Sequence, residues 1–235
     1  WTVDEKLKSC KYTWIHMGGD PDPNAPHELA LPEDLLGAGQ NNNTKLQPLN
    51  LILNAMYRIT LEGTDLAGNT GKKFIMSVVY DNVPPVLKLS YPESNTAVNH
   101  LDIAYALDEQ LENAQIIYTR VGGDPDPNSP VAVELQGSEL ESSFETQNTT
   151  STLPVLNDGS VYNIQFKGVD LATNSSESNI IENIKYDVTR PKITIFYPSG
   201  NSFFMGSDIN IDISEDLKEG AMIWSRTGGL NDNVT

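Results

Sequence analysis

The acidic residues are the ones in this chain whose type and spacing could bind a metal ion. The 235 residues include 32 Asp and Glu against 15 Lys and Arg, which gives a formal charge of −17. Many of these carboxylates stand in short loops beside glycine, proline or asparagine. Ca²⁺ takes about six to eight oxygen ligands, so loops of this kind are candidate calcium ligands wherever the fold brings two of them together.

One acidic loop occurs twice, almost letter for letter. Residues 18–24 read Gly-Gly-Asp-Pro-Asp-Pro-Asn, and the same letters return at 122–128. The prolines and glycines make this a rigid loop. Its Asp and Asn oxygens could bind a cation, or they could accept hydrogen bonds from nearby backbone amides and only brace the turn.

A second repeated stretch marks where one unit ends and the next begins. Residues 80–92 and 186–198 each end one strand at Tyr-Asp, turn through proline, and start an alternating strand that closes on Tyr-Pro. The spacing of the two copies is roughly 100 residues, which is a common domain size. The repeat therefore predicts consecutive domains joined by short proline-containing hinges.

The last hairpin of each unit has the clearest pattern. Residues 57–69 match residues 162–174, with alternating strands around an Asp-x-Ala-Gly-Asn turn in which Thr173 replaces Gly68. A tyrosine opens each hairpin, at the position where β-sandwiches use a tyrosine to fix a crossover loop. Both features predict a β-sandwich.

The elements that must position these loops are short strands. Each unit has about seven of them and no long helical period, and we expect an aromatic core residue at Trp14, Tyr118 and Trp224. Residues 222–226 are predicted to form a strand around Trp224, and the polar tracts 40–44 and 145–152 are predicted to be exposed loops. The predicted fold is all-β, with tandem immunoglobulin-like β-sandwich domains. We expect a first unit over 1–82 that lacks its first strand, a complete unit over 83–188, and the start of a third over 189–235.

The repeated hairpin, followed by Tyr-Asp and proline, resembles the bacterial Ig-like tandem repeats of large secreted and cell-surface proteins. The resemblance covers essentially the whole chain. It implies an extracellular or cell-surface location and a stalk, adhesin or surface-fibre segment, or else spacer modules of a secreted enzyme. The fold itself hosts many unrelated roles and does not choose among them.

Strand alternation predicts where the acidic loops meet. Loops of a sandwich collect at its two ends, so the trailing end of one unit faces the leading end of the next. We therefore predict interdomain Ca²⁺ sites that stiffen the array, although the Asp residues could equally brace turns or end strands. The predicted ligands at the first junction are Asp20, Asp22, Asn24, Asp81, Asp108, Glu109 and Asp170, and those at the second junction are Asp124, Asp126, Asn128, Asp187, Glu215 and Asp216.

Other functions find less support in the sequence. His16, His27 and His100 stand at non-equivalent positions without metal-ligand spacing, and no nucleophile-elbow or P-loop pattern occurs. Carboxylate pairs such as Asp108 and Glu109 could serve glycoside hydrolysis, but repeated solvated turns explain them better. We expect no catalytic activity, and Cys10 to be a free thiol in an acidic turn. The negative charge would repel nucleic acid, and no apolar run is long enough to span a membrane.

The predicted function is that of a structural or adhesive extracellular segment whose partners are neighbouring repeats and a cell-surface or glycan ligand. A carbohydrate-binding module is an alternative that needs an exposed coplanar aromatic pair among Tyr12, Trp14, Tyr91 and Tyr197. A filament subunit that self-assembles into fibres is another. In that case the opening strands of the third unit would complete the first unit of a neighbouring chain.

Overall fold

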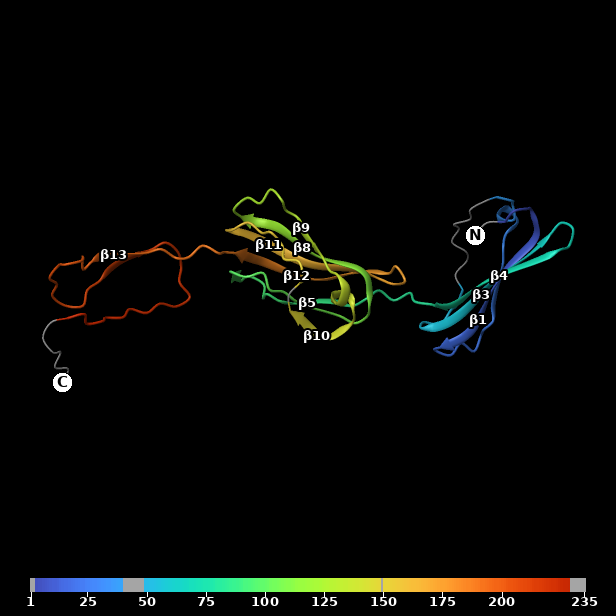
Figure 1. Ribbon diagram of the computed structural model, residues 1–235, viewed down its shortest axis with the longest axis horizontal. Helices are drawn as coiled ribbons and strands as arrows, with labels where there is room; N and C mark the ends of the chain where they lie inside the picture. Colours follow the sequence, from blue (N-terminus) through green and yellow to red (C-terminus); the bar gives the residue numbers. More distant parts are fainter. Residues whose placement is uncertain (1–2, 40–48, 149, 229–235) are drawn as a thin grey trace.

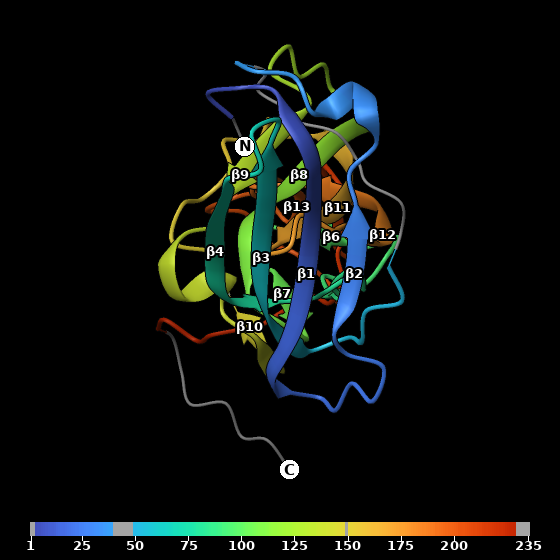
Figure 2. The same ribbon diagram turned by 90° about the vertical axis from the view of Figure 1, so that its right-hand side faces the viewer.

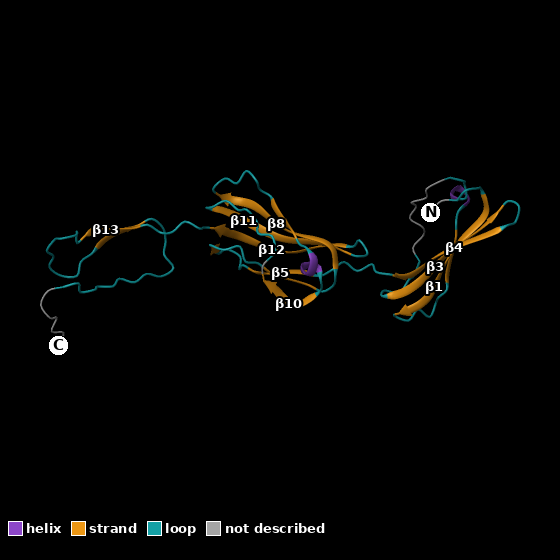
Figure 3. Ribbon diagram, in the orientation of Figure 1, coloured by secondary structure: helices purple, strands orange, loops and turns teal. Residues whose placement is uncertain are grey.

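The computed structural model describes residues 3–39, 49–148 and 150–228. Within these ranges the regular elements are strands and two short 3₁₀ turns (Figure 3). Three β-segments follow one another along the long axis of the molecule (Figure 1). We call residues 3–82 the first segment, 83–188 the middle segment and 189–228 the third segment. No helix in the described ranges is long and apolar enough to cross a membrane.

The middle segment has two sheets that enclose one core, which is the arrangement of a β-sandwich. The smaller sheet has the order β10-β7-β5 and the larger has the order β6-β12-β11-β8-β9, with every pair antiparallel except β6 and β12. The strands are β5 (Leu87–Tyr91), β6 (Ala97–Val98), β7 (Ala104–Leu107), β8 (Leu111–Gly123), β9 (Val131–Glu134), β10 (Ser143–Asn148), β11 (Ser160–Asp170) and β12 (Ser175–Tyr186).

Strict alternation builds this core. Every second residue of β11 is buried, because side chains along a strand point to opposite faces. Tyr162, Ile164 and Phe166 thereby face the smaller sheet, and the Phe166 ring meets Tyr105 of β7 edge to face at 5.3 Å. Burying a large apolar side chain stabilises a fold by about 1.5–3 kcal/mol. Tyr118 of β8 also lies in this core, as predicted.

The first segment is a single sheet in the order β2-β1-β3-β4 (Figure 2). Its small core contains Leu7, Cys10, Leu31 and Leu36. No second sheet faces it within the described ranges, so Trp14, a predicted core residue, is only half-buried. Its elements are β1 (Leu7–Gly19), β2 (His27–Ala30), the 3₁₀ turn η1 (Glu33–Leu35), β3 (Ala55–Asp65) and β4 (Thr70–Val79).

The first and middle segments share one order of elements. β1 and β8 both have 13 residues, and β3 and β11 both have 11. A four-residue strand and a 3₁₀ turn follow β1, and the same pair, with η2 (Gly137–Leu140), follows β8. β3 pairs with β1 and β4 as β11 pairs with β8 and β12. The repeated letters of the sequence thus occupy matching places in the sheets.

Three local predictions were wrong or fall outside the description. Cys10 lies inside β1 and is buried, and this burial raises the pKa of its thiol. The tract 145–152 is not wholly loop, because its first part pairs with β7 as the end of β10 and so satisfies the backbone of that edge. The tract 40–44, also predicted as loop, lies outside the described residues.

The third segment forms one antiparallel pair, β13 (Ile193–Tyr197) with β14 (Asn210–Ile213). The strand predicted at 222–226 is not formed, and Trp224 is exposed instead of buried. Its counterpart β8 is held by pairing with β11. Among the described residues of the third segment, nothing corresponds to β11.

Candidate metal centre at the first junction

Three carboxylates from separate elements converge where the first segment meets the middle segment. Asp81 follows β4, Glu109 stands in the turn between β7 and β8, and Asp170 ends β11. One carboxylate oxygen of each lies within 4.8 Å of the other two. The sequence predicted this meeting from the alternation of strand directions. We call these three residues the acidic cluster.

Asp170 is the fixed member of the cluster. Its side chain is fully buried and accepts hydrogen bonds from the backbone N–H of Ala172 and of Asn174, each at 2.8 Å. The side-chain amide of Asn174 donates to its other oxygen at 2.8 Å. Thr173 completes this turn at φ 72°, where the first segment has Gly68 at φ 95°. The repeated Asp-x-Ala-Gly/Thr-Asn sequence therefore holds one carboxylate in place.

The linker between the segments is tied to the same loops. Asp108 accepts a hydrogen bond from the backbone N–H of Val86 at 2.7 Å, and Asp81 accepts one from Val83 at 3.0 Å. The side-chain amide of Asn174 reaches the carbonyl oxygen of Val83 at 3.4 Å. Pro85, in the middle of the linker, is fully buried. These contacts place Asp81 of the first segment beside two loops of the middle segment.

The electrostatics of the cluster favour a cation. Burial raises the pKa of Glu109, and the negative charges of Asp81, Asp170 and Asp108 raise it further. Within the described residues, no Lys, Arg or His forms an ion pair with the three carboxylates of the cluster. They can offer about three to six oxygen ligands to a hard divalent cation, with the rest from water or backbone carbonyls. Both Ca²⁺ and Mg²⁺ prefer such ligands.

The predicted ligand Asp22 is engaged elsewhere. Its carboxylate accepts hydrogen bonds from the Tyr57 hydroxyl at 2.6 Å, from Nε2 of His27 at 2.6 Å and from the backbone N–H of Asn24 at 3.0 Å. The Tyr57 bond, followed by the His27 and Asn24 bonds, lowers the pKa of Asp22 to about 2. This carboxylate braces its loop and lies outside the acidic cluster.

The middle segment repeats this brace. Asp126 accepts hydrogen bonds from the Tyr162 hydroxyl at 2.6 Å and from the backbone N–H of Asn128 at 2.9 Å. Both tyrosine hydroxyls also accept a backbone N–H, Tyr57 from Ile52 at 3.0 Å and Tyr162 from Asn157 at 2.9 Å. The predicted role of these tyrosines in fixing a loop is confirmed. The other predicted ligands of the two loops, Asp20, Asn24, Asp124 and Asn128, are exposed.

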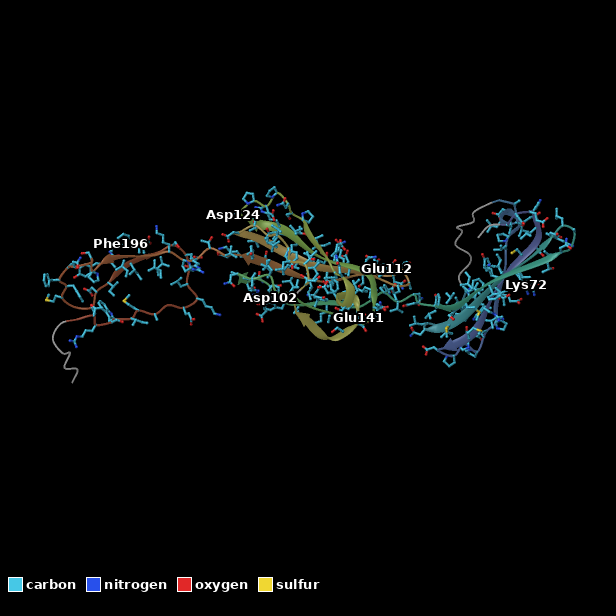
Figure 4. All side chains as sticks on the ribbon, viewed as in Figure 1. Lys72, Asp102, Glu112, Asp124, Glu141 and Phe196 are labelled. Atoms are coloured by element: carbon cyan, nitrogen blue, oxygen red, sulfur yellow. The ribbon has the colours of Figure 1, made fainter. Side chains whose placement is uncertain are left out.

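The second junction has a different charge balance. Asp187, the counterpart of Asp81, forms an ion pair with Lys185 at 2.7 Å, which raises the pKa of that lysine. Glu215, the counterpart of Glu109, has one buried oxygen without a hydrogen-bond partner. Asp216 is exposed, and Asp124 lies at this end of the middle segment (Figure 4). The sequence shows this difference, because Lys185 stands at the position that Val79 of β4 occupies in the first segment.

Two of the four predicted aromatic side chains contact each other, but they do not form a flat platform. Tyr12 and Trp14 touch, but their rings are tilted by 39° and both are half-buried. Tyr91 stacks on His100, and its hydroxyl lies 3.0 Å from Nε2 of that histidine. The coplanar pair that a sugar-binding module needs is not formed by Tyr12 and Trp14.

Comparison with known proteins adds no relative to this description. The chain matches none of the protein-family models, and no curated protein matches it in sequence. The geometry itself defines an all-β protein with an acidic cluster where two β-segments join.

Proposed function

We propose that this chain is a structural, adhesive segment of an extracellular protein, built from tandem Ig-like repeats whose first junction is stiffened by Ca²⁺. The observation that carries the proposal is the acidic cluster. Asp81 belongs to one segment, whereas Glu109 and Asp170 belong to the next. A cation bound there joins the two segments through ligands from both.

The tandem-repeat part of the proposal is supported by matching side-chain contacts as well as matching strands. The bond from Tyr57 to Asp22 and the bond from Tyr162 to Asp126 have the same length, 2.6 Å. A stack of such units gains reach because each unit contacts mainly its neighbours. In this proposal the chain acts by spanning distance and presenting a surface to a cell-surface or glycan ligand, without catalysis.

Calcium would change the junction because it replaces repulsion among the three carboxylates by attraction of each carboxylate to the cation. Without a cation the three carboxylates repel one another across a distance of less than 5 Å, and partial burial strengthens this repulsion. With a cation the same oxygens become ligands. Binding to the folded state adds stability by mass action, about 2.7 kcal/mol when free Ca²⁺ is about 100 times the dissociation constant.

The test is thermal unfolding of the full chain in Ca²⁺ and in chelator, with Glu109→Gln as the variant. Wild type is expected to melt higher in Ca²⁺. Glu109→Gln keeps the shape but removes one charge, so it should melt higher than wild type in chelator and lower than wild type in Ca²⁺. Asp124→Asn, an exposed predicted ligand outside the cluster, serves as the matched control and should follow wild type in both conditions.

The sign of the chelator result follows from the raised pKa of Glu109. Because its pKa is higher in the folded state, ionising this carboxyl costs stability as pH rises through that range, and the cost is present at neutral pH. Removing the charge removes the cost. If the wild-type melting temperature does not change with Ca²⁺, the cluster is not a calcium site. The same conclusion follows if Asp124→Asn loses the Ca²⁺ response as fully as Glu109→Gln does.

A further inference from the structure

The repeated acidic loop contains four Asp–Pro peptide bonds, because Asp-Pro-Asp-Pro occurs at 20–23 and again at 124–127. In such a bond the aspartate carboxyl can attack its own backbone carbonyl carbon through a five-membered ring, so the nucleophile and its target belong to one residue. The proline nitrogen is also more basic than the nitrogen of an ordinary peptide bond and leaves more readily. How fast each of the four bonds breaks in the folded chain then depends on its surroundings.

The carbonyl oxygen of Asp124 accepts two side-chain hydrogen bonds. Nε of Arg120 donates to it at 2.7 Å, and the hydroxyl of Ser160 donates to it at 2.6 Å. Ser160 opens β11 and is fully buried, whereas Arg120 lies on β8 and carries a positive charge. Attack on this carbonyl carbon would place a negative charge on the same oxygen. Donors already aimed at that oxygen, one of them cationic, stabilise this charge more than they stabilise the neutral peptide bond.

The start of β11 also fixes the backbone on both sides of this bond. The N–H of Asp124 donates to the carbonyl oxygen of Gly159 at 3.0 Å, and the side-chain amide of Asn157 donates to the carbonyl oxygen of Pro125 at 3.1 Å. The Asp124 carboxylate itself is exposed and lies against Gly159, where an added Cβ would come within 2.5 Å of its Oδ2. Glycine at 159 therefore leaves room for this carboxylate, while the target carbonyl is held in place.

The second Asp–Pro bond of the same loop has different surroundings. The carboxylate of Asp126 is buried and accepts hydrogen bonds from the Tyr162 hydroxyl at 2.6 Å and from the backbone N–H of Asn128 at 2.9 Å. Its carbonyl oxygen accepts a longer backbone hydrogen bond, from Ser129 at 3.3 Å. This carboxylate would have to break the brace before it could attack. The Asp126–Pro127 bond thus provides a reference of the same chemistry in the same loop.

The first segment has a weaker version of the arrangement around Asp124. Nε2 of His16 lies 3.0 Å from the carbonyl oxygen of Asp20, in the place that Arg120 takes in the middle segment. Ala55 begins β3 where Ser160 begins β11, and alanine has no hydroxyl to donate. Asp20 therefore has one of the two donors, and this donor is an imidazole instead of a guanidinium.

We propose that the bond between Asp124 and Pro125 is a self-cleavage site that acts in mild acid. A carboxylate oxygen of Asp124 bonds to its own backbone carbonyl carbon, and Arg120 and Ser160 hold the oxyanion that forms. The bond from this carbon to the nitrogen of Pro125 then breaks as the nitrogen takes a proton from the solvent, which leaves a five-membered cyclic anhydride. One water molecule opens the anhydride. The products are one chain that ends at Asp124 and one that begins at Pro125.

The test is incubation of the full chain at about pH 5, above the range in which protonation of Asp22 weakens its brace. Fragments are measured by mass spectrometry in denaturant, because β8 and β11 stay paired after the cut. Fragments 1–124 and 125–235 should form at least about tenfold faster than fragments from the other three Asp–Pro bonds. In urea, which unfolds the chain, the four bonds should break at similar rates because their surroundings no longer differ.

Three variants test the named groups. Asp124→Ala removes the nucleophile and should abolish this cut. Ser160→Ala, which copies Ala55 of the first segment, removes one donor and should slow the cut by at least about tenfold. The reverse change, Ala55→Ser, supplies the missing hydroxyl and should speed the cut after Asp20.

Equal rates at Asp124–Pro125 and Asp126–Pro127 in the folded chain would overturn the inference, because they would show only the ordinary acid lability of Asp–Pro bonds. A folded chain that is cut no faster than the chain in urea would do the same. An unchanged rate in Ser160→Ala would remove the role of the donors. The inference does not rest on the proposed function, and none of these results bears on the melting response to Ca²⁺.

Discussion

At the scale of single residues, a tyrosine hydroxyl joined to a buried aspartate is the most exact repeated feature of this chain. Tyr162 donates to Asp126 at 2.6 Å and accepts from the backbone of Asn157 at 2.9 Å, so one oxygen fixes two loops. The first aspartate of each of the two matching loops, Asp20 and Asp124, is exposed to solvent. The loop is braced by its second aspartate and leaves its first one free.

We predict that Tyr162→Phe destabilises the middle segment by about 1–3 kcal/mol, because it leaves a buried carboxylate oxygen without its donor. Hydrogen exchange measured segment by segment checks this, since local stabilities can be read separately in one chain. Protection should fall over residues 157–170 and remain unchanged over β3 and β4. Tyr57→Phe should give the reverse pattern, and loss of protection in both segments with either variant would contradict the prediction.

The lowered pKa of Asp22 makes the first segment acid-sensitive. Its pKa is about 2 in the folded chain, below the value of about 3.9 for an unperturbed Asp. A depressed carboxyl pKa contributes stability that is fully present above the unfolded value and is lost as pH falls toward the folded value. We predict that protection of loop 18–24 declines between about pH 4 and pH 2. In Asp22→Asn, protection should be lower at neutral pH and flat over this range, and an unchanged slope would refute the assignment.

These residue-scale roles were only half predictable. The tyrosine positions at 57 and 162 indicated a fixed loop, because the opening of a late strand is where sandwiches use this device. Nothing in the letters Asp-Pro-Asp-Pro-Asn separates a ligand from a brace. The choice depends on Tyr57, which approaches Asp22 from 35 positions away only once the sheet has formed.

At the scale of elements, equivalent strands differ in burial according to what covers them. Leu89 of β5 is 3% exposed in the closed sandwich, whereas Ile195 of β13 is exposed to solvent. The surroundings, rather than the strands themselves, create this difference, since both strands have the same register with their neighbours.

We predict that Leu89→Ala lowers the stability of the middle segment by about 2–5 kcal/mol, the usual cost of a cavity in a packed core. Ile195→Ala should change stability by less than about 0.5 kcal/mol at concentrations where the chain is monomeric, because its side chain loses little contact. Denaturant unfolding followed by hydrogen exchange measures both. Similar losses in the two variants would mean that β13 is covered within one chain.

Strands were predicted well where apolar and polar residues alternate clearly, and poorly where this alternation is weak. The alternating hairpins at 57–69 and 162–174 became β3 with β4 and β11 with β12. β10 was missed because its polar sequence has no apolar alternation, and its pairing with β7 supplies the order that the letters do not. Cys10 was misplaced because β1 begins earlier, at Leu7.

At the scale of the whole molecule, the candidate site was predictable in outline. Strand alternation alone indicated that Asp81 would meet Glu109 and Asp170, and the three do meet. The matching site at the second junction was predicted too, but there Lys185 holds Asp187. One substitution on an exit strand changes the charge balance of a junction, so the carboxylates of the two junctions stand in different electrostatic surroundings.

The last prediction concerns the stiffness of the first junction. Spin labels at Lys72→Cys and Glu112→Cys, which lie on the first and middle segments (Figure 4), can be attached in a Cys10→Ser background. We expect the distribution of label distances to be narrow in Ca²⁺ and broad in chelator. Added monovalent salt should not narrow it, because the screening length at 0.15 M is about 8 Å, longer than the spacing of the carboxylate oxygens.

The variant Glu109→Gln distinguishes two explanations of a stiff junction, namely bound calcium and packing alone. In this variant the distribution should respond little to Ca²⁺, while Asp124→Asn should behave as wild type. If wild type is narrow in chelator, the buried Pro85 and the bond from Asp108 to Val86 suffice to hold the segments, and the cation adds nothing to stiffness. A broad distribution in Ca²⁺ would show that neither the linker nor the cluster orients the first segment.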